Sequence, residues 1–192
     1  MIRNQDRSGW FGASDTAAVM GSWATQTFRS WWLVKLGTIS GHFSTRAMEV
    51  GNLFEIPIIH AIEALEGRRI RLGKHPIYLP RYRIRANYDG LCGTLIEIKT
   101  TRKMFKKVPK GYWQQCQVLM FAARRRLAEL YAYELTDFDY EAPYFPEIDP
   151  GRLHRFEIVY DDAFIHSDYL PRVETLARAL RERRYPIAPD QI

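Results

Sequence analysis

NYDGLCGTLIEIKTT, residues 87–101, is the stretch that decides the expected fold and the expected chemistry. Its second half, TLIEIKTT, alternates apolar and polar residues as a β-strand does. Because side chains two positions apart on a strand share a face, Glu97 and Lys99 are expected to point to the same side. Asp89 is expected at the end of a preceding strand, residues 84–89, which the turn signal Asp-Gly closes. The stretch therefore predicts two carboxylates and an amine at one place on a sheet.

Such a cluster has a definite chemical use. Two carboxylates that converge repel each other unless a hard divalent cation lies between them. A lysine beside them can orient or help to deprotonate a water molecule, or stabilise developing negative charge. This combination suits metal-assisted hydrolysis of a phosphodiester. A Glu-x-Lys pair alone also fits the solvated face of an ordinary amphipathic strand, and the preceding strand end at Asp89 favours the catalytic interpretation.

Length and composition predict one folded domain, residues 1–192, because 46% of the residues are hydrophobic and 14% are aromatic. The sequence has no run of eighteen apolar residues and no apolar signal core at its start, so a cytoplasmic protein without a membrane segment is expected. Cys92 and Cys116 lack the spacing of metal ligands. Reduced thiols are therefore expected, and iron–sulfur or zinc chemistry is not indicated.

The net charge of +6 is unevenly distributed. Residues 68–88 hold seven Lys or Arg and no acid, and residues 99–110 hold six more and again no acid. Such runs can be solvated surfaces, but beside a candidate metal site they indicate a surface that binds a polyanion. Four lysines that follow the strand with Glu97 and Lys99 are expected to contact the backbone phosphates of such a polyanion: Lys103, Lys106, Lys107 and Lys110.

The remaining sequence predicts an α/β domain built around one central mixed sheet flanked by helices. Helices are expected at residues 15–20 after an N-cap at Ser14, 28–37 after Thr27, 46–67 after Thr45, 112–126 and 161–184. Strands are expected near residues 68–72, 76–79, 82–88, 94–101, 127–135 and 154–160. Pro57 is expected either to kink the third helix or to mark its start.

Four motifs follow one another along the chain: RSGWFGASD at residues 7–15, GNLFE at 51–55, ANYDG with EIK at 86–99, and YWQQCQ at 112–117. In this order they resemble the PD-(D/E)XK nuclease superfamily, and within it the lambda exonuclease and YqaJ-type viral recombinase group. The resemblance covers roughly residues 7–122 and implies a restriction-endonuclease-like core.

The resemblance also implies roles for individual residues. Asp89, Glu97 and the carbonyl of Ile98 would bind metal ions, and Glu55 would complete the site. Lys99 would act on the attacking water or on the scissile phosphate. Glu55 lies mid-helix among apolar neighbours, where an unpaired carboxylate is costly, so a bridge to an arginine is the alternative to a metal.

Three further residues carry implied roles. Gln115 resembles the glutamine that helps to hold the nucleophilic water or the lysine, and only the motif alignment chooses it over Gln114 and Gln117. Arg7 and Ser14 resemble the family's pocket for a 5′-terminal phosphate. An arginine fork and a hydroxyl beside a helix N-terminus do form an anion site. The alternatives are a terminal charge for Arg7 and a simple helix cap for Ser14.

Several aromatic residues remain open at this stage. Trp10 and Phe11 lie near the expected phosphate pocket and could wedge between bases, whereas Trp31 and Trp32 on a helix are more typical of a core. Tyr88 stands where the family often has proline or serine. It could stack on a base or pack beneath the sheet.

The function that the resemblance implies is a Mg²⁺-dependent 5′→3′ exonuclease. It would hydrolyse one strand of linear double-stranded DNA to mononucleotides and leave 3′ single strands for recombination by strand annealing. Two Mg²⁺ ions are expected, for which Mn²⁺ can substitute. A homo-oligomeric ring of three subunits on DNA ends and a single-strand annealing protein as partner are implied in the same way. The alternatives are a related endonuclease of restriction or repair type and a non-catalytic DNA-binding protein.

Overall fold

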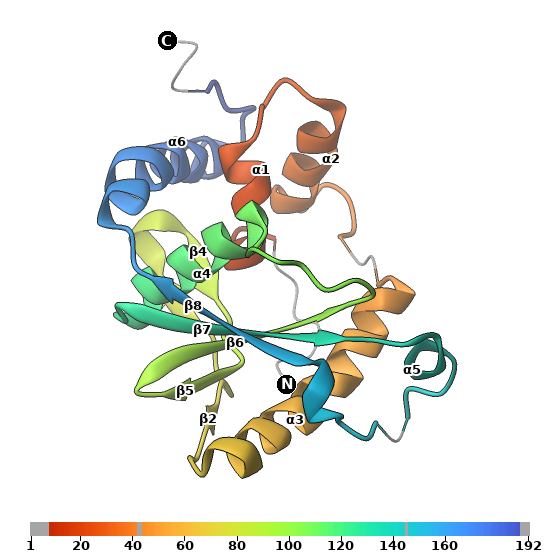
Figure 1. Ribbon diagram of the computed structural model, residues 1–192. Helices are drawn as coiled ribbons and strands as arrows, with labels where there is room; N and C mark the ends of the chain where they lie inside the picture. The colour runs from red at the N-terminus through yellow and green to blue at the C-terminus, as the bar shows by residue number, and fades with distance from the viewer. Residues whose placement is uncertain (1–7, 42–43, 145, 189–192) are drawn as a thin grey trace.

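The computed structural model describes residues 8–41, 44–144 and 146–188, and its main layer is a five-stranded mixed sheet (Figure 1). In spatial order the strands are β2 (Arg71–Leu72), β5 (Gly90–Cys92), β6 (Thr94–Thr101), β7 (Leu127–Glu134) and β8 (Leu153–Val159). β6 and β7 run parallel, and the other neighbours are antiparallel. Helices cover both faces, so the expected α/β class with a mixed sheet between helices is confirmed (Figure 1).

Alternation along β6 sorts its side chains between the two faces of the sheet. Leu95 belongs to the buried cluster that contains the apolar residues of α4 (Lys110–Ala123), whereas Ile96 and Ile98 pack with those of α3 (Arg46–Glu66). α4 is also the crossover that two parallel neighbouring strands require. The odd-numbered residues of β6 therefore face α4.

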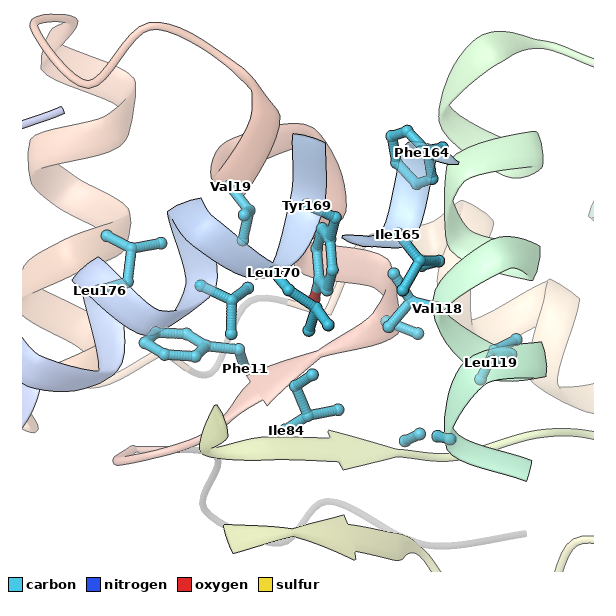
Figure 2. Packing of buried hydrophobic residues seen from close by; sticks show 14 of the residues in the cluster. Phe11, Val19, Ile84, Val118, Leu119, Phe164, Ile165, Tyr169, Leu170 and Leu176 are labelled. Carbon is cyan, nitrogen blue, oxygen red and sulfur yellow. The ribbon is translucent and has the colours of Figure 1, made fainter. Parts of the chain in front are cut away.

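A second, three-stranded sheet was not expected. It consists of β1 (Phe11–Gly12), β4 (Ile84–Ala86) and β3 (Ile77–Leu79), with β1 parallel to β4. The prediction of one sheet was wrong because β4 pairs with β1, from more than seventy positions earlier, and not with β5. This pairing buries Phe11 and Ile84 completely, and Figure 2 shows both residues in a cluster with Tyr169 and Leu170.

The remaining helical elements surround these sheets. They are the 3₁₀ turn η1 (Ala13–Asp15), α1 (Thr16–Met20), α2 (Gln26–Lys35), the 3₁₀ turns η2 (Pro80–Tyr82) and η3 (Pro150–Arg152), α5 (Asp137–Glu141), the π-helical η4 (Phe164–Tyr169) and α6 (Leu170–Arg181). The last predicted helix, residues 161–184, thus contains a π-helical segment. None of the helices in the described ranges is long and apolar enough to cross a membrane.

Three N-caps were predicted from the sequence, and the structure shows what lies at the start of each helix. Thr45 caps α3 as expected, because its side chain accepts a hydrogen bond from the backbone of Met48. Thr27 does not cap α2, since Thr25 accepts the corresponding bond from Phe28. Ser14 does not cap α1, because it lies inside the η1 turn. The Pro57 position lies within α3, which continues through it.

Candidate active site

A cleft of about 440 Å³ opens beside α3, β6, α4 and η1. Seven of the residues predicted from the sequence line it: Ser14, Glu55, Asp89, Glu97, Ile98, Lys99 and Gln115. They come from segments far apart in the chain, and the two sheets and two helices bring them together. The geometry of each determines what the cleft can do.

Glu97 is the central residue of the cleft. It is 2% exposed, and its Oε1 accepts hydrogen bonds from Lys99 Nζ at 2.7 Å and from Gln115 Nε2 at 2.6 Å. The predicted shared face of Glu97 and Lys99 is therefore confirmed. Its other oxygen, Oε2, is buried and accepts no hydrogen bond within the described part of the chain. Because a buried carboxylate oxygen without a donor is costly, this atom is a natural ligand for a cation.

Asp89 lies directly before β5, and its Oδ2 accepts a hydrogen bond from the backbone N–H of Ile98 at 2.7 Å. The expected position at the end of a strand was wrong, because β4 already ends at Ala86. The Asp-Gly dipeptide is not the hairpin turn either. Gly93, with φ of +69°, makes the turn between β5 and β6.

The backbone around Asp89 is held by a close approach from β2. The N–H of Gly73 donates to the Asp89 carbonyl at 3.0 Å. A Cβ atom at Gly73 would lie 1.8 Å from the carbonyl oxygen of Tyr88, so only glycine fits there.

Glu55 reaches the cleft from α3. One turn earlier, a Cβ atom at Gly51 would lie 3.1 Å from Thr100 Oγ1, so glycine lets the helix approach β6 closely. The Gly-x-x-x-Glu spacing then turns Glu55 toward the same opening. The charged groups of the cleft that act on Glu55 are Glu97 and Lys99, and within the described ranges no arginine bridges it.

Burial and the repulsion between the negative charges of the cleft's carboxylates raise the pKa of Asp89 and Glu55. Burial, together with the charges of Glu97 and Glu55, raises the pKa of Asp89 well above its ordinary value. Burial and the charge of Glu97 also raise the pKa of Glu55. A bound cation would relieve this repulsion.

Lys99 remains an ammonium group in this setting. Burial alone would lower the pKa of Lys99, but the charges of Glu97 and Asp89 and the hydrogen bond to Glu97 outweigh it and raise the pKa. The ammonium also lies over the ring of Tyr112, 5.3 Å from its centre. This environment favours a hydrogen-bond donor and a stabiliser of negative charge over a proton acceptor.

The side chains that line the cleft fit a hard divalent cation, since the carboxylates of Glu55, Asp89 and Glu97 supply oxygen ligands. Within the described residues, no three His, Cys, Asp or Glu side chains already stand together as a metal-ligand group. Oε2 of Glu97 is buried without a hydrogen-bond donor in the described ranges, so a cation there would have an available ligand.

The structure separates the three glutamines of α4. Gln115 donates to Glu97 in the cleft, whereas Gln117 donates to the carbonyl of Val159 and accepts from the N–H of Asp161. Gln114 is buried and does not line the cleft. The geometry therefore agrees with the choice of Gln115.

Ser14 lines the cleft, but Arg7 lies outside the described residues. The sequence did not reveal what holds Ser14 in place. Asp15 accepts hydrogen bonds from the N–H of Gly12 at 2.6 Å, from Lys35 Nζ at 2.6 Å and from Trp31 Nε1 at 3.0 Å. The acid of the N-terminal motif thus fixes the η1 turn.

The four predicted DNA-contacting lysines are all exposed. Lys103, Lys106 and Lys107 lie in the loop between β6 and α4, and Lys110 begins α4. None of the four lines the cleft itself. They follow the end of β6, whose residues line the cleft, and we call this set of four lysines the lysine loop.

The aromatic residues divide between core and cleft. Phe11 and Trp32 are core residues, at 0% and 1% exposure, and Trp31 packs partly buried against the same cluster. Trp10 is half-buried, edge-on to the ring of Tyr78. Tyr88 both packs against the core and lines the cleft.

Comparison with known proteins identifies a family and a shared fold. A family model described as the YqaJ-like viral recombinase domain matches residues 4–126. Among solved structures, the alkaline exonuclease LHK-Exo from Laribacter hongkongensis is similar, with 23% identity over 92% of this chain and 90% of that chain. The TM-score is 0.69 for its complex with dAMP and 0.66 for a second structure.

A phage-related exonuclease from Haemophilus somnus 129PT is also similar in structure. It covers 91% of this chain and 94% of its own, with 13% identity and a TM-score of 0.65. These similarities show a shared fold. No curated protein sequence matches the chain.

Proposed function

This chain belongs to the YqaJ-like viral recombinase family, and on that premise we propose that it is a nuclease acting on DNA. More specifically, we propose a Mg²⁺-dependent 5′→3′ exonuclease that degrades one strand of linear duplex DNA to mononucleotides. The observation that carries the proposal is the convergence of Asp89, Glu97 and Lys99 in one cleft, with Oε2 of Glu97 buried and without a hydrogen-bond donor.

The similar structures support an exonuclease in particular. Two of them are described as exonucleases, and one was crystallised with dAMP, a deoxynucleoside monophosphate. A mononucleotide is the product expected from an enzyme that removes one residue at a time from an end. The 3′ single strand that remains would serve recombination by strand annealing.

In the proposed chemistry, Asp89, Glu97, Glu55 and the carbonyl of Ile98 would hold the metal. When bound, two Mg²⁺ ions supply Lewis acidity and a hydroxide-like nucleophile at neutral pH. Gln115 and the Lys99 ammonium occupy Oε1 of Glu97, and this arrangement leaves Oε2 for the metal.

In this proposal Lys99 would also donate a hydrogen bond to an oxygen of the scissile phosphate. There it would stabilise the negative charge that develops during in-line displacement. Tyr112 and Glu97 hold its ammonium group in position. Mn²⁺ is expected to replace Mg²⁺, because the proposed ligands are oxygen atoms.

Two other surfaces would bind the DNA. The lysine loop would contact backbone phosphates of the duplex, since its four lysines are exposed and follow β6. Arg7 and Ser14 would hold the 5′-terminal phosphate, which would make cleavage start from an end. By family resemblance we also propose a ring of three subunits and a single-strand annealing protein as partner.

The decisive experiment is a time course on linear duplex DNA labelled separately at each 5′ end and each 3′ end, with and without Mg²⁺. The proposal expects immediate release of the 5′ label as mononucleotide, late release of the 3′ label, and no release in EDTA. A closed circular plasmid should resist the enzyme. Rapid cutting of the circle would identify an endonuclease instead, and binding without any turnover would indicate a non-catalytic DNA-binding protein.

A further inference from the structure

Besides the partly buried Lys99, a second cationic side chain lines the cleft. Arg85 lies at the centre of β4, is 5% exposed and contributes to the cleft wall. Its neighbours Ile84 and Ala86 belong to the hydrophobic core. Because side chains alternate along a strand, Arg85 faces away from that core and toward the opening. Lys35, which is buried to a similar degree, lies outside the cleft in a salt bridge with Asp15.

The pairing of the small sheet places Arg85 next to the turn that carries Ser14. β1 and β4 are parallel, and Gly12 stands opposite Arg85 in their register. From Gly12 the chain continues directly into Ala13 and Ser14, which line the same cleft. Arg85 and the η1 turn thus belong to one wall of the cleft.

The acids come from different parts of the structure. Glu55 lies on α3, Glu97 on β6 and Asp89 just before β5. The charges that act most strongly on the pKa of Asp89 are those of Glu97, Glu55 and Lys99. The cleft is therefore lined by acids from α3, β6 and the start of β5, which suit a cation, and by Arg85 and Ser14 from β4 and the η1 turn, which suit an anion.

We propose that Arg85 is a specificity-determining residue that binds the terminal 5′-phosphate of the DNA together with Ser14. This rests on the function proposed above. A terminal phosphomonoester carries about −1.5 to −2 charges at neutral pH, more than an internal diester, so a buried guanidinium selects an end. Its planar fork can bind two phosphate oxygens at once. Arg85 already has an interaction within the chain, but a guanidinium has five N–H donors, so donors remain for a ligand.

The test compares linear duplexes that differ only in a 5′-phosphate or a 5′-hydroxyl, with the parent, Arg85→Gln and Arg85→Lys. The parent should prefer the phosphorylated end. Arg85→Gln should reduce the ratio of the two rates by about tenfold or more, the size of a lost charge-assisted hydrogen bond. Arg85→Lys keeps the charge but loses the planar guanidinium, so its ratio of rates should lie between those of the parent and Arg85→Gln. Arg81→Gln is the control, because Arg81 is exposed on the same segment and pairs with Glu174.

Equilibrium binding of both duplexes in EDTA provides a readout that does not depend on turnover. The parent and Arg81→Gln should bind the phosphorylated duplex more tightly, and Arg85→Gln should lose that preference while its melting curve remains cooperative. If the parent does not discriminate between the ends, or Arg85→Gln keeps the full preference, the proposal for Arg85 is overturned. If the parent discriminates in binding but releases no nucleotide with Mg²⁺, the nuclease function fails and the phosphate site stands.

Discussion

Gln115 on α4 donates a 2.6 Å hydrogen bond to Oε1 of Glu97 on β6. This bond fixes the rotamer of a buried carboxylate whose other oxygen has no donor in the described chain. Gln115→Ala is therefore expected to slow DNA hydrolysis about 10- to 100-fold, because it removes a hydrogen bond to a buried charge. Single-turnover rates on linear duplex would measure this. Gln114→Ala is the matched control, and an equal loss in that variant would contradict a specific role for Gln115.

Removing the ammonium group of Lys99 should slow hydrolysis more than Gln115→Ala does. Lys99→Ala is expected to reduce the rate of hydrolysis by about 10²–10³-fold, the range typical of losing one donor that stabilises developing negative charge, while DNA binding is retained. Gel-shift titration in EDTA, beside the rate measurement, separates the two effects. A Lys99→Ala protein as fast as the parent would remove the basis of the mechanism.

Asp89→Asn should stabilise the metal-free protein while it abolishes turnover. Burial and the charges of Glu97 and Glu55 raise the pKa of Asp89, so the folded state binds a proton more tightly than the unfolded state. Stability then falls as pH rises from about 4, the unfolded pKa, through the raised folded pKa. At pH 7.5 in EDTA, the Tm of Asp89→Asn should exceed that of the parent by about 2–4 °C, equivalent to about 1 kcal/mol.

Thermal melts in EDTA and in Mg²⁺ would check this prediction. Mg²⁺ should raise the Tm of the parent more than that of Asp89→Asn, since the variant lacks one charged ligand. At pH 4 the difference between the two proteins in EDTA should shrink. A lower Tm for the variant at pH 7.5 in EDTA would show that repulsion does not dominate at this position.

Gly73→Ala should displace Asp89 through the neighbouring Tyr88, which the added methyl group would meet. The added Cβ would lie 1.8 Å from the Tyr88 carbonyl oxygen, so β2 and the segment that carries Asp89 must separate. We expect a loss of about 1–3 kcal/mol in unfolding free energy and at least a tenfold loss of nuclease rate. Gly111→Ala is the contrasting variant, because nothing lies within 4 Å of its Cβ, and in helix α4 it should stabilise by about 0.5–1 kcal/mol.

The lysine loop should determine how DNA affinity depends on salt. Removing one lysine that binds a phosphate should make the slope of log K against log salt less negative by about 0.9. Successive Lys→Gln changes at Lys103, Lys106, Lys107 and Lys110 should therefore flatten the slope stepwise. The exposed Arg178 and Arg181 on α6 are suitable controls, and an unchanged slope in the fourfold variant would assign DNA binding to another surface.

Local sequence patterns predicted the structure correctly where a residue's neighbours in sequence are also its neighbours in space. The alternation around Glu97 and Lys99 predicted their common side, and the 2.7 Å hydrogen bond between them confirms it. The Thr45 cap is of the same kind, because its hydrogen bond spans three residues. Thr27 shows the limit of this reasoning, since two threonines two positions apart carry nearly the same cap signal.

Partnerships between distant segments could not be predicted in this way. Nothing in residues 84–86 shows that they pair with Phe11 and Gly12 and leave the central sheet. Glu129 on β7 reads as the polar side of an amphipathic strand, yet it is buried and bound by Arg68 and Arg155. Such positions depend on side chains that arrive from other elements, and a one-dimensional pattern does not contain that information.

The division of the molecule into two separately hydrogen-bonded sheets has a practical consequence. The groups proposed to break the bond lie on or beside the larger sheet, α3 and α4, and the groups proposed to recognise a strand end lie on β4 of the smaller sheet and in the η1 turn. A protein engineer could thus redesign which termini are accepted by altering only β1, β4 and their turn. Glu55, Glu97 and Lys99 would keep their own scaffold, whereas Asp89 follows β4 by only three positions, so changes at the end of that strand would alter the proposed metal site as well.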